Sequence, residues 1–232
     1  MADFVLVHGA WHGAWCWRRV LPALWSAGHR AFAVSLTGVG ERRHISPDAA
    51  SLATHVEDVV AVIEAEELHG AVLVGHSYGG IVITGVADRL AARLGHLVYL
   101  DAVVLRPGEC WSSGNDAATR AARRQAIAAQ GVLPPPDPAV FGLHGADAEW
   151  VQRRQTPHPG RPYDEALDFD PARVASVPRT FVSCTAPALA TIDPSRARAA
   201  TEPGWRSVDL ATGHDPMISA PEAVVDLLKA LP

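Results

Sequence analysis

A nucleophilic serine is predicted by the pentapeptide Gly-His-Ser-Tyr-Gly at residues 75–79. The apolar run 71–74 precedes it, and small and β-branched residues follow at 81–87, which is the order of a strand, a sharp turn and a helix. The turn strains the backbone at Ser77, and glycines on both sides remove the clashes that side chains would cause. Such a turn exposes the Ser77 hydroxyl and directs the free N–H groups of the next helix toward a bound oxygen. The alternative is a solvated serine in a glycine-rich turn.

A second stretch, His-Gly-Ala-Trp-His at residues 8–12, could supply hydrogen-bond donors. It follows the wholly apolar run 4–7, which is typical of a buried strand. A strand that ends in His-Gly can turn a backbone N–H into the cavity that holds the serine. We therefore predict an oxyanion hole from the N–H groups of Ala10 and of Tyr78, the residue after the serine. Three neighbouring residues, Gly9, Trp11 and His12, are candidates for binding substrate. For His12, simple packing in the core is an equal alternative.

A base and an acid are needed to activate a serine hydroxyl. The base is an imidazole in hydrogen-bond reach, and the imidazole needs a carboxylate that fixes its tautomer. His214 is the one histidine among 11 that follows the last predicted strand, in the sequence Gly-His-Asp. Asp101 stands at the end of an apolar run, where a carboxylate is costly unless it is paired. His214 is the predicted base, and Asp101 is either its acid or a loop cap.

These side chains require a scaffold, and six apolar runs predict the strands of one sheet. The predicted strands cover residues 4–7, 30–36, 71–75, 97–101, 180–184 and 205–210. Helical spacing and helix-start signals predict helices at residues 15–27, from 51, at 81–94, from 193 and at 221–231. The fold class is therefore α/β, with a mostly parallel sheet flanked by helices.

The chain changes character between the fourth and fifth predicted strands. Prolines cluster twice there, an Ala/Arg-rich stretch at 116–130 is helical, and no strand-like run appears before residue 179. We predict a small helical lid at 103–178, inserted into a core formed by residues 1–102 and 179–232. Candidates for the pocket-facing side of the lid are Trp111, Phe141, Leu143, Trp150 and Tyr163.

Composition and charge narrow the function classes. The 232 residues suit one α/β domain, and the net charge of −5 without a basic stripe argues against nucleic acid as a partner. Three scattered cysteines form neither a disulfide framework nor a metal spacing, which fits a cytoplasmic location. No G-x-G-x-x-G stretch follows a strand, and no apolar run is long enough to span a bilayer. We expect no cofactor, no metal and no membrane partner.

The chain resembles α/β-hydrolases of the group that contains plant methyl esterases, plant hydroxynitrile lyases and a set of bacterial carboxylesterases, and it looks nearest to the bacterial esterases. The resemblance covers nearly the whole chain and is strongest at residues 4–15, 75–80, 100–102 and 212–215. It implies an α/β-hydrolase fold with Ser77 as nucleophile, His214 as base and the N–H groups of Ala10 and Tyr78 as oxyanion hole. Members of the family often dimerise through the lid, so the resemblance implies a possible homodimer.

The acid is the one departure from this family pattern. The family usually places it just after the strand that ends at Cys184, but here residues 184–188 read Cys-Thr-Ala-Pro-Ala, without a carboxylate. Asp101 and Asp193 are the two substitutes. Asp193 also has the form of a helix N-cap, because Pro194 follows it. Asp101 is favoured because it ends the strand next to the serine turn.

The predicted function is a serine carboxylic-ester hydrolase that acts on a small-molecule ester or thioester through an acyl-enzyme on Ser77. A biosynthetic thioesterase, cyclase or decarboxylase on a polyketide-like substrate is the alternative, which the missing acid favours. The hydroxynitrile lyases of the group carry Thr and Lys where this chain has Gly9 and Asp215, which argues against that reaction. A non-catalytic ligand receptor is disfavoured because Ser77 and His214 are both present.

Overall fold

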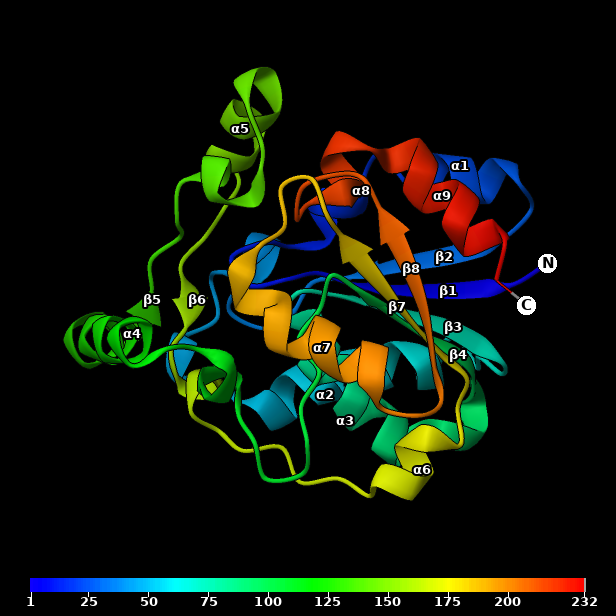
Figure 1. The fold of residues 1–232 in the computed structure, drawn as a ribbon, viewed down its shortest axis with the longest axis horizontal. Helices are drawn as coiled ribbons and strands as arrows, with labels where there is room; N and C mark the ends of the chain where they lie inside the picture. Colours follow the sequence, from blue (N-terminus) through cyan, green and yellow to red (C-terminus); the bar gives the residue numbers. More distant parts are fainter. Residues whose placement is uncertain (232) are drawn as a thin grey trace.

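A six-stranded sheet forms the centre of the computed structural model, which describes residues 1–231 (Figure 1). Neighbouring strands are parallel throughout, in the order β2-β1-β3-β4-β7-β8. The strands are β1 (Asp3–Val7), β2 (Arg30–Val34), β3 (Ala71–His76), β4 (Leu94–Leu100), β7 (Arg179–Cys184) and β8 (Trp205–Leu210). The predicted α/β fold with a mostly parallel sheet is confirmed.

Burial along the strands follows their place in the sheet. β1 and β3 occupy inner positions with helices on both faces, so residues 4–7 and all of β3 are buried. Their sequences are continuous apolar runs for this reason, without polar residues at alternate positions. β8 has one neighbour, and its residues are half-buried or exposed.

Helices cover both faces of the sheet, as Figure 1 shows: α2, α3 and α6 lie on one side, and α1 and α9 lie on the other. α7 contacts β7 and β8. The bounds are α1 (Leu21–Ser26), α2 (Leu52–Ala65), α3 (Gly79–Leu90), α6 (Pro171–Ala175), α7 (Asp193–Thr201), α8 (Pro216–Ser219) and α9 (Pro221–Lys229). Single 3₁₀ turns lie at Ala14–Trp17, Gly40–Arg42, Pro47–Ala49, Ala91–Arg93, Trp111–Gly114, Pro138–Phe141, Arg161–Tyr163 and Ala190–Ile192.

The helix predicted at residues 15–27 is divided into a 3₁₀ turn, Ala14–Trp17, and the short α1. Pro22 stands in the first turn of α1. Proline has no N–H and its ring clashes with the carbonyl four residues earlier, so it begins a helix but does not continue one. Apolar periodicity alone did not reveal this break.

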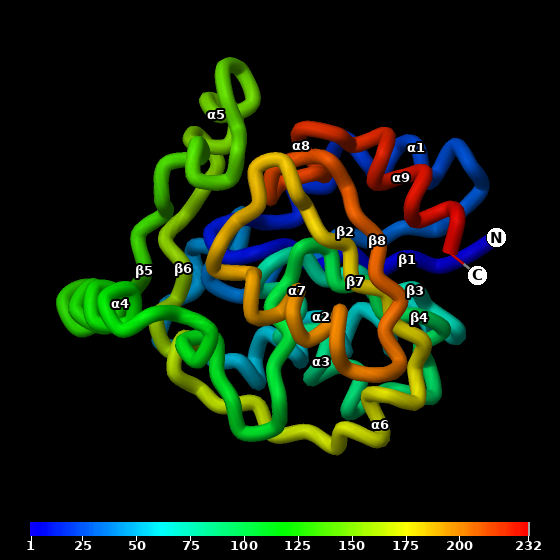
Figure 2. Tube along the Cα trace, in the orientation of Figure 1, coloured from blue at the N-terminus to red at the C-terminus, as the bar shows by residue number. Residues whose placement is uncertain are grey.

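The segment between β4 and β7 projects from the sheet on the side where the serine turn lies. It contains α4 (Ala117–Gln130), α5 (Gly145–Gln152) and two short antiparallel strands, β5 (Val132–Leu133) and β6 (His158–Pro159). Figure 2 shows α4 and α5 apart from the helices that flank the sheet, whereas α6 returns to pack on α3. The expectation of no strand before residue 179 was wrong, because two-residue strands are too short to leave an alternating pattern. The lid bounds 103 and 178 stay a prediction.

A helix must be both long and apolar to cross a membrane. Within residues 1–231, no helix combines the length and the apolar character that crossing a membrane requires.

Candidate active site

The turn between β3 and α3 places Ser77 in the left-handed region of backbone space, at a φ of +53°. Such a conformation costs roughly 1–3 kcal/mol in a residue other than glycine, so the surrounding structure must hold it. The chain closes tightly here, because a Cβ atom on Gly75 would lie 2.6 Å from the Gly79 carbonyl oxygen. A Cβ atom on Gly79 would lie 2.9 Å from the carbonyl oxygens of Val7 and His8. The glycines of the pentapeptide therefore permit the strained turn predicted from the sequence.

Three residues from three separate loops form a hydrogen-bonded chain. The Ser77 hydroxyl lies 2.9 Å from His214 Nε2, and His214 Nδ1 lies 2.7 Å from Asp101 Oδ2. Because a carboxylate only accepts, Nδ1–H donates to Asp101 and Nε2 is left to accept the serine proton. Asp101 is fully buried and His214 is 2% exposed. The structure thus brings Ser77, His214 and Asp101 together in the order that serine activation requires.

Asp101 is held from its other side by Arg196. Asp101 Oδ1 accepts from Arg196 Nη2 at 2.8 Å and from the Cys184 backbone N–H at 3.1 Å. This oxygen therefore has two donors while Oδ2 faces His214, which fixes the orientation of the carboxylate. Residue types alone did not reveal Arg196, because its partner lies 95 positions away in the chain.

Within residues 1–231, the Asp193 carboxylate makes no hydrogen bond with His214. Its carboxylate accepts from Arg196 Nη1 at 2.6 Å, and its side chain is 64% exposed. The predicted N-cap role is also wrong, since Ile192 is the N-cap of α7 and Asp193 is its first residue. Asp193 thus contacts the arginine that holds Asp101 and does not take the place of Asp101.

The N–H groups predicted for an oxyanion hole stand free on either side of the serine turn. Within residues 1–231, neither the Ala10 N–H nor the Tyr78 N–H donates to another backbone or side-chain group. The Tyr78 side chain is buried, and its hydroxyl donates to His55 Nδ1 at 2.9 Å. Both N–H groups are therefore available to an oxygen placed beside Ser77.

The three predicted substrate-binding residues have different surroundings. Trp11 lines the pocket together with Ser77 and His214. Gly9 does not line it but allows close approach, since a Cβ atom there would lie 2.8 Å from Ser77 Cβ. His12 is buried and is absent from the pocket wall, so the packing alternative describes its position.

His12 belongs to a buried ionic pair beneath the serine turn. His12 Nδ1–H donates to the Ala10 carbonyl at 2.8 Å, and Nε2 lies 3.1 Å from Asp215 Oδ2. Burial opposes charge on both groups, yet His12 lowers the pKa of Asp215 to about 2 and Asp215 raises the pKa of His12. A charged pair thus holds the carbonyl of Ala10, whose N–H is a predicted oxyanion donor.

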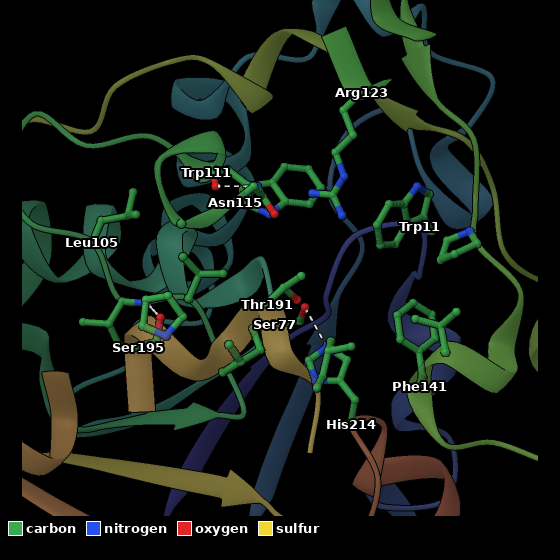
Figure 3. Close-up of a pocket in the computed structure, with 18 of the residues that line it drawn as sticks. Trp11, Ser77, Leu105, Trp111, Asn115, Arg123, Phe141, Thr191, Ser195 and His214 are labelled. Carbon is green, nitrogen blue, oxygen red and sulfur yellow. Dashed lines mark hydrogen bonds between the residues drawn. The ribbon is translucent and has the colours of Figure 1, made fainter. Parts of the chain in front are cut away.

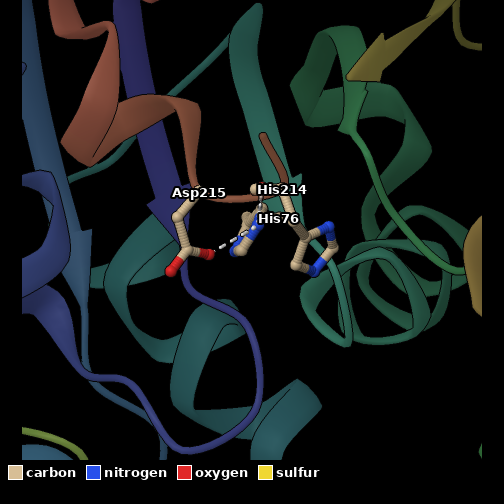
Figure 4. Close-up of side chains that lie close together, drawn as sticks. All are labelled: His76, His214 and Asp215. Carbon is tan, nitrogen blue, oxygen red and sulfur yellow. Dashed lines mark hydrogen bonds and ion pairs between the residues drawn. The ribbon is translucent and has the colours of Figure 1, made fainter. Parts of the chain in front are cut away.

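His76, for which the sequence suggested no role, supports the loop of His214 (Figure 4). Burial, followed by the nearby His214, lowers the pKa of His76 to about 3, so its ring is neutral. His76 Nε2–H donates to the His214 backbone carbonyl at 2.8 Å. The histidine beside the serine therefore positions the backbone of the predicted base.

His76, His214 and Asp215 are close enough to hold a metal ion, with candidate ligand atoms within 4.8 Å of one another (Figure 4). Both ring nitrogens of His214 already have partners, namely Asp101 and Ser77. His76 Nε2 donates to a carbonyl, and Asp215 pairs with His12. Because both nitrogens of His214 are committed to the chain from Ser77 to Asp101, His214 has no free ligand atom, and the three residues do not fit a resident metal ion.

The ionic pair predicts how stability depends on pH. The lowered pKa of Asp215 stabilises the fold above pH 3.8, and this contribution is lost as the pH falls toward 2. The raised pKa of His12 stabilises the fold below pH 6.5, and this contribution is lost as the pH rises through the folded-state pKa. Both contributions are present between about pH 4 and 6.5.

In Asp215→Asn, burial is left as the main effect on His12, so its pKa should fall below 6.5. The unfolded chain then binds a proton that the folded chain does not, and the variant should lose about 1.4 kcal/mol of unfolding free energy per pH unit below 6.5. Urea unfolding from pH 7 to 5, with NMR titration of His12, measures this loss. Parallel pH curves for wild type and variant would contradict the charged pair.

The pocket above Ser77 is walled mainly by apolar side chains of the core loops and the projecting segment (Figure 3). Of the predicted pocket-facing residues, Trp111 and Phe141 line it, whereas Leu143, Trp150 and Tyr163 do not. Its charged residues are Glu109, Arg123 and Arg198. A largely apolar cleft over a hydrogen-bonded serine can bind a small organic molecule and hold its carbonyl for attack.

Known proteins resemble this chain in sequence over part or all of its length. The sequence profile of the alpha/beta hydrolase family matches residues 4–227. A "Carbendazim hydrolyzing esterase" from Nocardioides sp. (strain SG-4G) is 38% identical over 250 residues, which cover 100% of both chains. A probable esterase from Oryza sativa subsp. indica is 37% identical over 46% of this chain and 41% of its own. Methylesterases and an alpha-hydroxynitrile lyase of Arabidopsis thaliana also match, each over 43% of this chain.

Solved structures agree with the observed architecture. An extracellular alpha/beta-hydrolase from a Paenibacillus species superposes with a TM-score of 0.85, covers 98% of each chain and is 21% identical in sequence. At that identity the likeness concerns the fold alone.

Proposed function

The chain belongs to the alpha/beta hydrolase family and is a carboxylesterase-like hydrolase, and from that premise we propose that it cleaves small carboxylic esters through an acyl-enzyme on Ser77. The observation that carries the proposal is the hydrogen-bonded chain from Ser77 through His214 to Asp101, in which Ser77 and His214 line the pocket. The esterases among the relatives support it, and they confirm the family resemblance seen in the sequence.

The proposed first step forms a bond between Ser77 Oγ and the ester carbonyl carbon while the serine proton passes to His214 Nε2. The imidazolium is stabilised by its Nδ1–H bond to Asp101, whose charge is retained. The carbonyl oxygen becomes negative and accepts from the Ala10 and Tyr78 N–H groups, each worth about 10²–10³ in rate. When the bond to the alcohol oxygen breaks, His214 returns the proton to the leaving alcohol.

The second step repeats this sequence with water as the nucleophile. His214 takes a proton from water as the water oxygen attacks the acyl carbon, and it returns that proton to Ser77 as the acid departs. Asp101 keeps the same imidazole tautomer in both steps, because Arg196 and the Cys184 N–H hold its second oxygen.

A fluorophosphonate probe tests this proposal directly. We expect the wild-type protein to hydrolyse p-nitrophenyl acetate and butyrate and to lose that activity in proportion to labelling. One phosphonyl group per chain, located on the peptide that contains Ser77, should appear by mass spectrometry. Hydrolysis that persists after complete labelling, or a label on another residue, would contradict the assignment of Ser77.

The alternative functions find less support. The missing acid after Cys184 favoured the thioesterase, cyclase or decarboxylase hypothesis, whereas Asp101 lies 2.7 Å from His214. For the lyase reaction, Asp215 stands where the lyases have Lys, and it is buried against His12 outside the pocket wall. Gly9 offers no hydroxyl where those enzymes have Thr.

A further inference from the structure

Arg123 of α4 reaches into the pocket wall and is not part of the proposed reaction. In Figure 3 its guanidinium lies beside Trp11 and Trp111, with Ser77 and His214 farther along the same pocket. Its Cζ atom is 5.8 Å from the centre of the Trp11 ring, 5.2 Å from Trp111 and 5.5 Å from Tyr163. The cation therefore sits among aromatic faces at a position that a bound molecule can contact.

Arg123 is the pocket cation that has no acidic partner among residues 1–231. Arg198 and Glu109, the other charged pair of the wall, bind each other with Nη2 to Oε1 at 2.7 Å. The neighbouring Arg124 pairs with Asp164, with Nε to Oδ2 at 2.9 Å, and neither residue lines the pocket. The fixed charge that the wall presents is thus the positive charge of Arg123.

Within residues 1–231, the N–H groups of Arg123, which lie in the plane of the guanidinium, do not all have hydrogen-bond acceptors. Nη1 is buried and, within the described chain, makes no hydrogen bond. Aromatic stacking stabilises the face of a guanidinium but does not satisfy its N–H donors, which lie in the plane. Burial lowers the pKa of Arg123 while Tyr163 opposes this, and arginine stays charged in proteins. A buried donor on a cation requires an acceptor, preferably an anion with two oxygens in one plane.

The aromatic side chains around Arg123 also indicate which shape of molecule can bring an acceptor to its N–H groups. Trp11 and Trp111 meet edge to face with centroids 5.9 Å apart, and Phe141 lies 6.1 Å from Trp11. Flat rings pack well between such walls. The group between the ester and the anion is therefore expected to be aromatic.

We propose that Arg123 is a specificity-determining residue that binds a free carboxylate on the substrate, so that the site prefers aromatic esters bearing a second, ionised carboxyl group. The proposal rests on the esterase function proposed above for the same pocket. The carboxylate completes the guanidinium donors, the aromatic ring packs against Trp11 and Trp111, and the ester carbonyl lies toward Ser77.

The test compares the ortho, meta and para methyl half-esters of benzenedicarboxylic acid with the matching primary amides, which have the same shape without the charge. A hydrogen bond between two charged groups is worth about a 10- to 100-fold change, so the best half-ester should exceed its amide in kcat/KM by that factor. In Arg123→Met the ratio should fall to about 1, and in Arg123→Lys it should be intermediate because the planar fork is lost. Arg124→Met is the matched control and should keep the wild-type ratio.

Two results would overturn the proposal: no half-ester surpasses its amide in the wild type, or Arg123→Met and Arg123→Lys both keep the preference. A binding experiment separates this proposal from the esterase function. It measures binding of the benzenedicarboxylates to the Ser77→Ala variant by the change in tryptophan fluorescence. In one outcome, the wild type hydrolyses no ester, but the dicarboxylates bind to Ser77→Ala and do not bind to the double variant Ser77→Ala/Arg123→Met. The esterase function is then wrong, and the carboxylate site is supported. If esters are hydrolysed without a charge preference, only the carboxylate site fails.

Discussion

Replacement of Ser77 by alanine is expected to lower kcat for p-nitrophenyl acetate by about 10⁶-fold, the loss typical of a serine protease without its nucleophile. The variant keeps His214, Asp101 and the free N–H groups, but it has no oxygen that can form the acyl bond. Single-turnover and steady-state assays of the purified variant measure this loss. We expect residual hydrolysis to match that of a variant lacking both Ser77 and His214, because the two residues act as a unit.

The fold of Ser77→Ala should be unchanged, because alanine has the same Cβ atom and tolerates the same backbone. Ser77→Gly provides a second control. Glycine removes the cost of the φ of +53°, so the unfolding free energy should rise by about 1 kcal/mol while activity stays abolished. A Ser77→Ala protein that is folded and retains a tenth of wild-type turnover would disprove the nucleophile assignment.

Asp101→Asn is expected to lower kcat by about 10⁴-fold at pH 7, as loss of the correct imidazole tautomer does in serine proteases. The amide would offer an N–H to His214 Nδ1, so that Nε2 carries the proton and cannot accept one from Ser77. The variant should also be less stable, because Arg196, whose side chain is 15% exposed, loses the buried one of the two carboxylates it binds.

Asp193→Asn is the matched comparison, because it removes the other carboxylate bound to Arg196. That pair is exposed on the Asp193 side, and such pairs contribute only about 0–1 kcal/mol. Turnover should therefore stay within about threefold of wild type. The assignment of Asp101 would be wrong if Asp193→Asn lost activity and Asp101→Asn kept it; kcat/KM of both variants with one ester distinguishes the two results.

Local sequence signals predicted the scaffold well where they were strong. The continuous apolar runs of β1 and β3 mark strands buried on both faces, and the glycines around Ser77 mark a turn that other residues would obstruct. Helix breaks and the β5–β6 pairing were missed. Pro22 divides a periodic stretch, and the two-residue strands are held by partners that lie 25 and 27 residues away along the chain.

The supporting residues of the site could not be found in the same way. His76 and Asp215 adjoin Ser77 and His214 in sequence, yet their partners are the His214 carbonyl and His12. Arg123 was one arginine of an Ala/Arg-rich helix, and nothing in that composition shows which arginine faces a pocket. Each of these roles depends on a contact between segments that are distant in the chain.

The sequence by itself determined the strand–turn–helix around Ser77, the alternation of strands and helices that indicates an α/β fold, and the position of His214 after the last strand, because each depends on residues within a few positions of one another. Which of the two carboxylates, Asp101 or Asp193, lies against His214 depends on the tertiary structure. The sheet order sets β4 between β3 and β7, so the end of β4 delivers Asp101 under His214, while α7 turns Asp193 toward solvent and Arg196. A carboxylate orients an imidazole only within hydrogen-bond distance, and that distance is set by strand order and loop path, which no local pattern encodes.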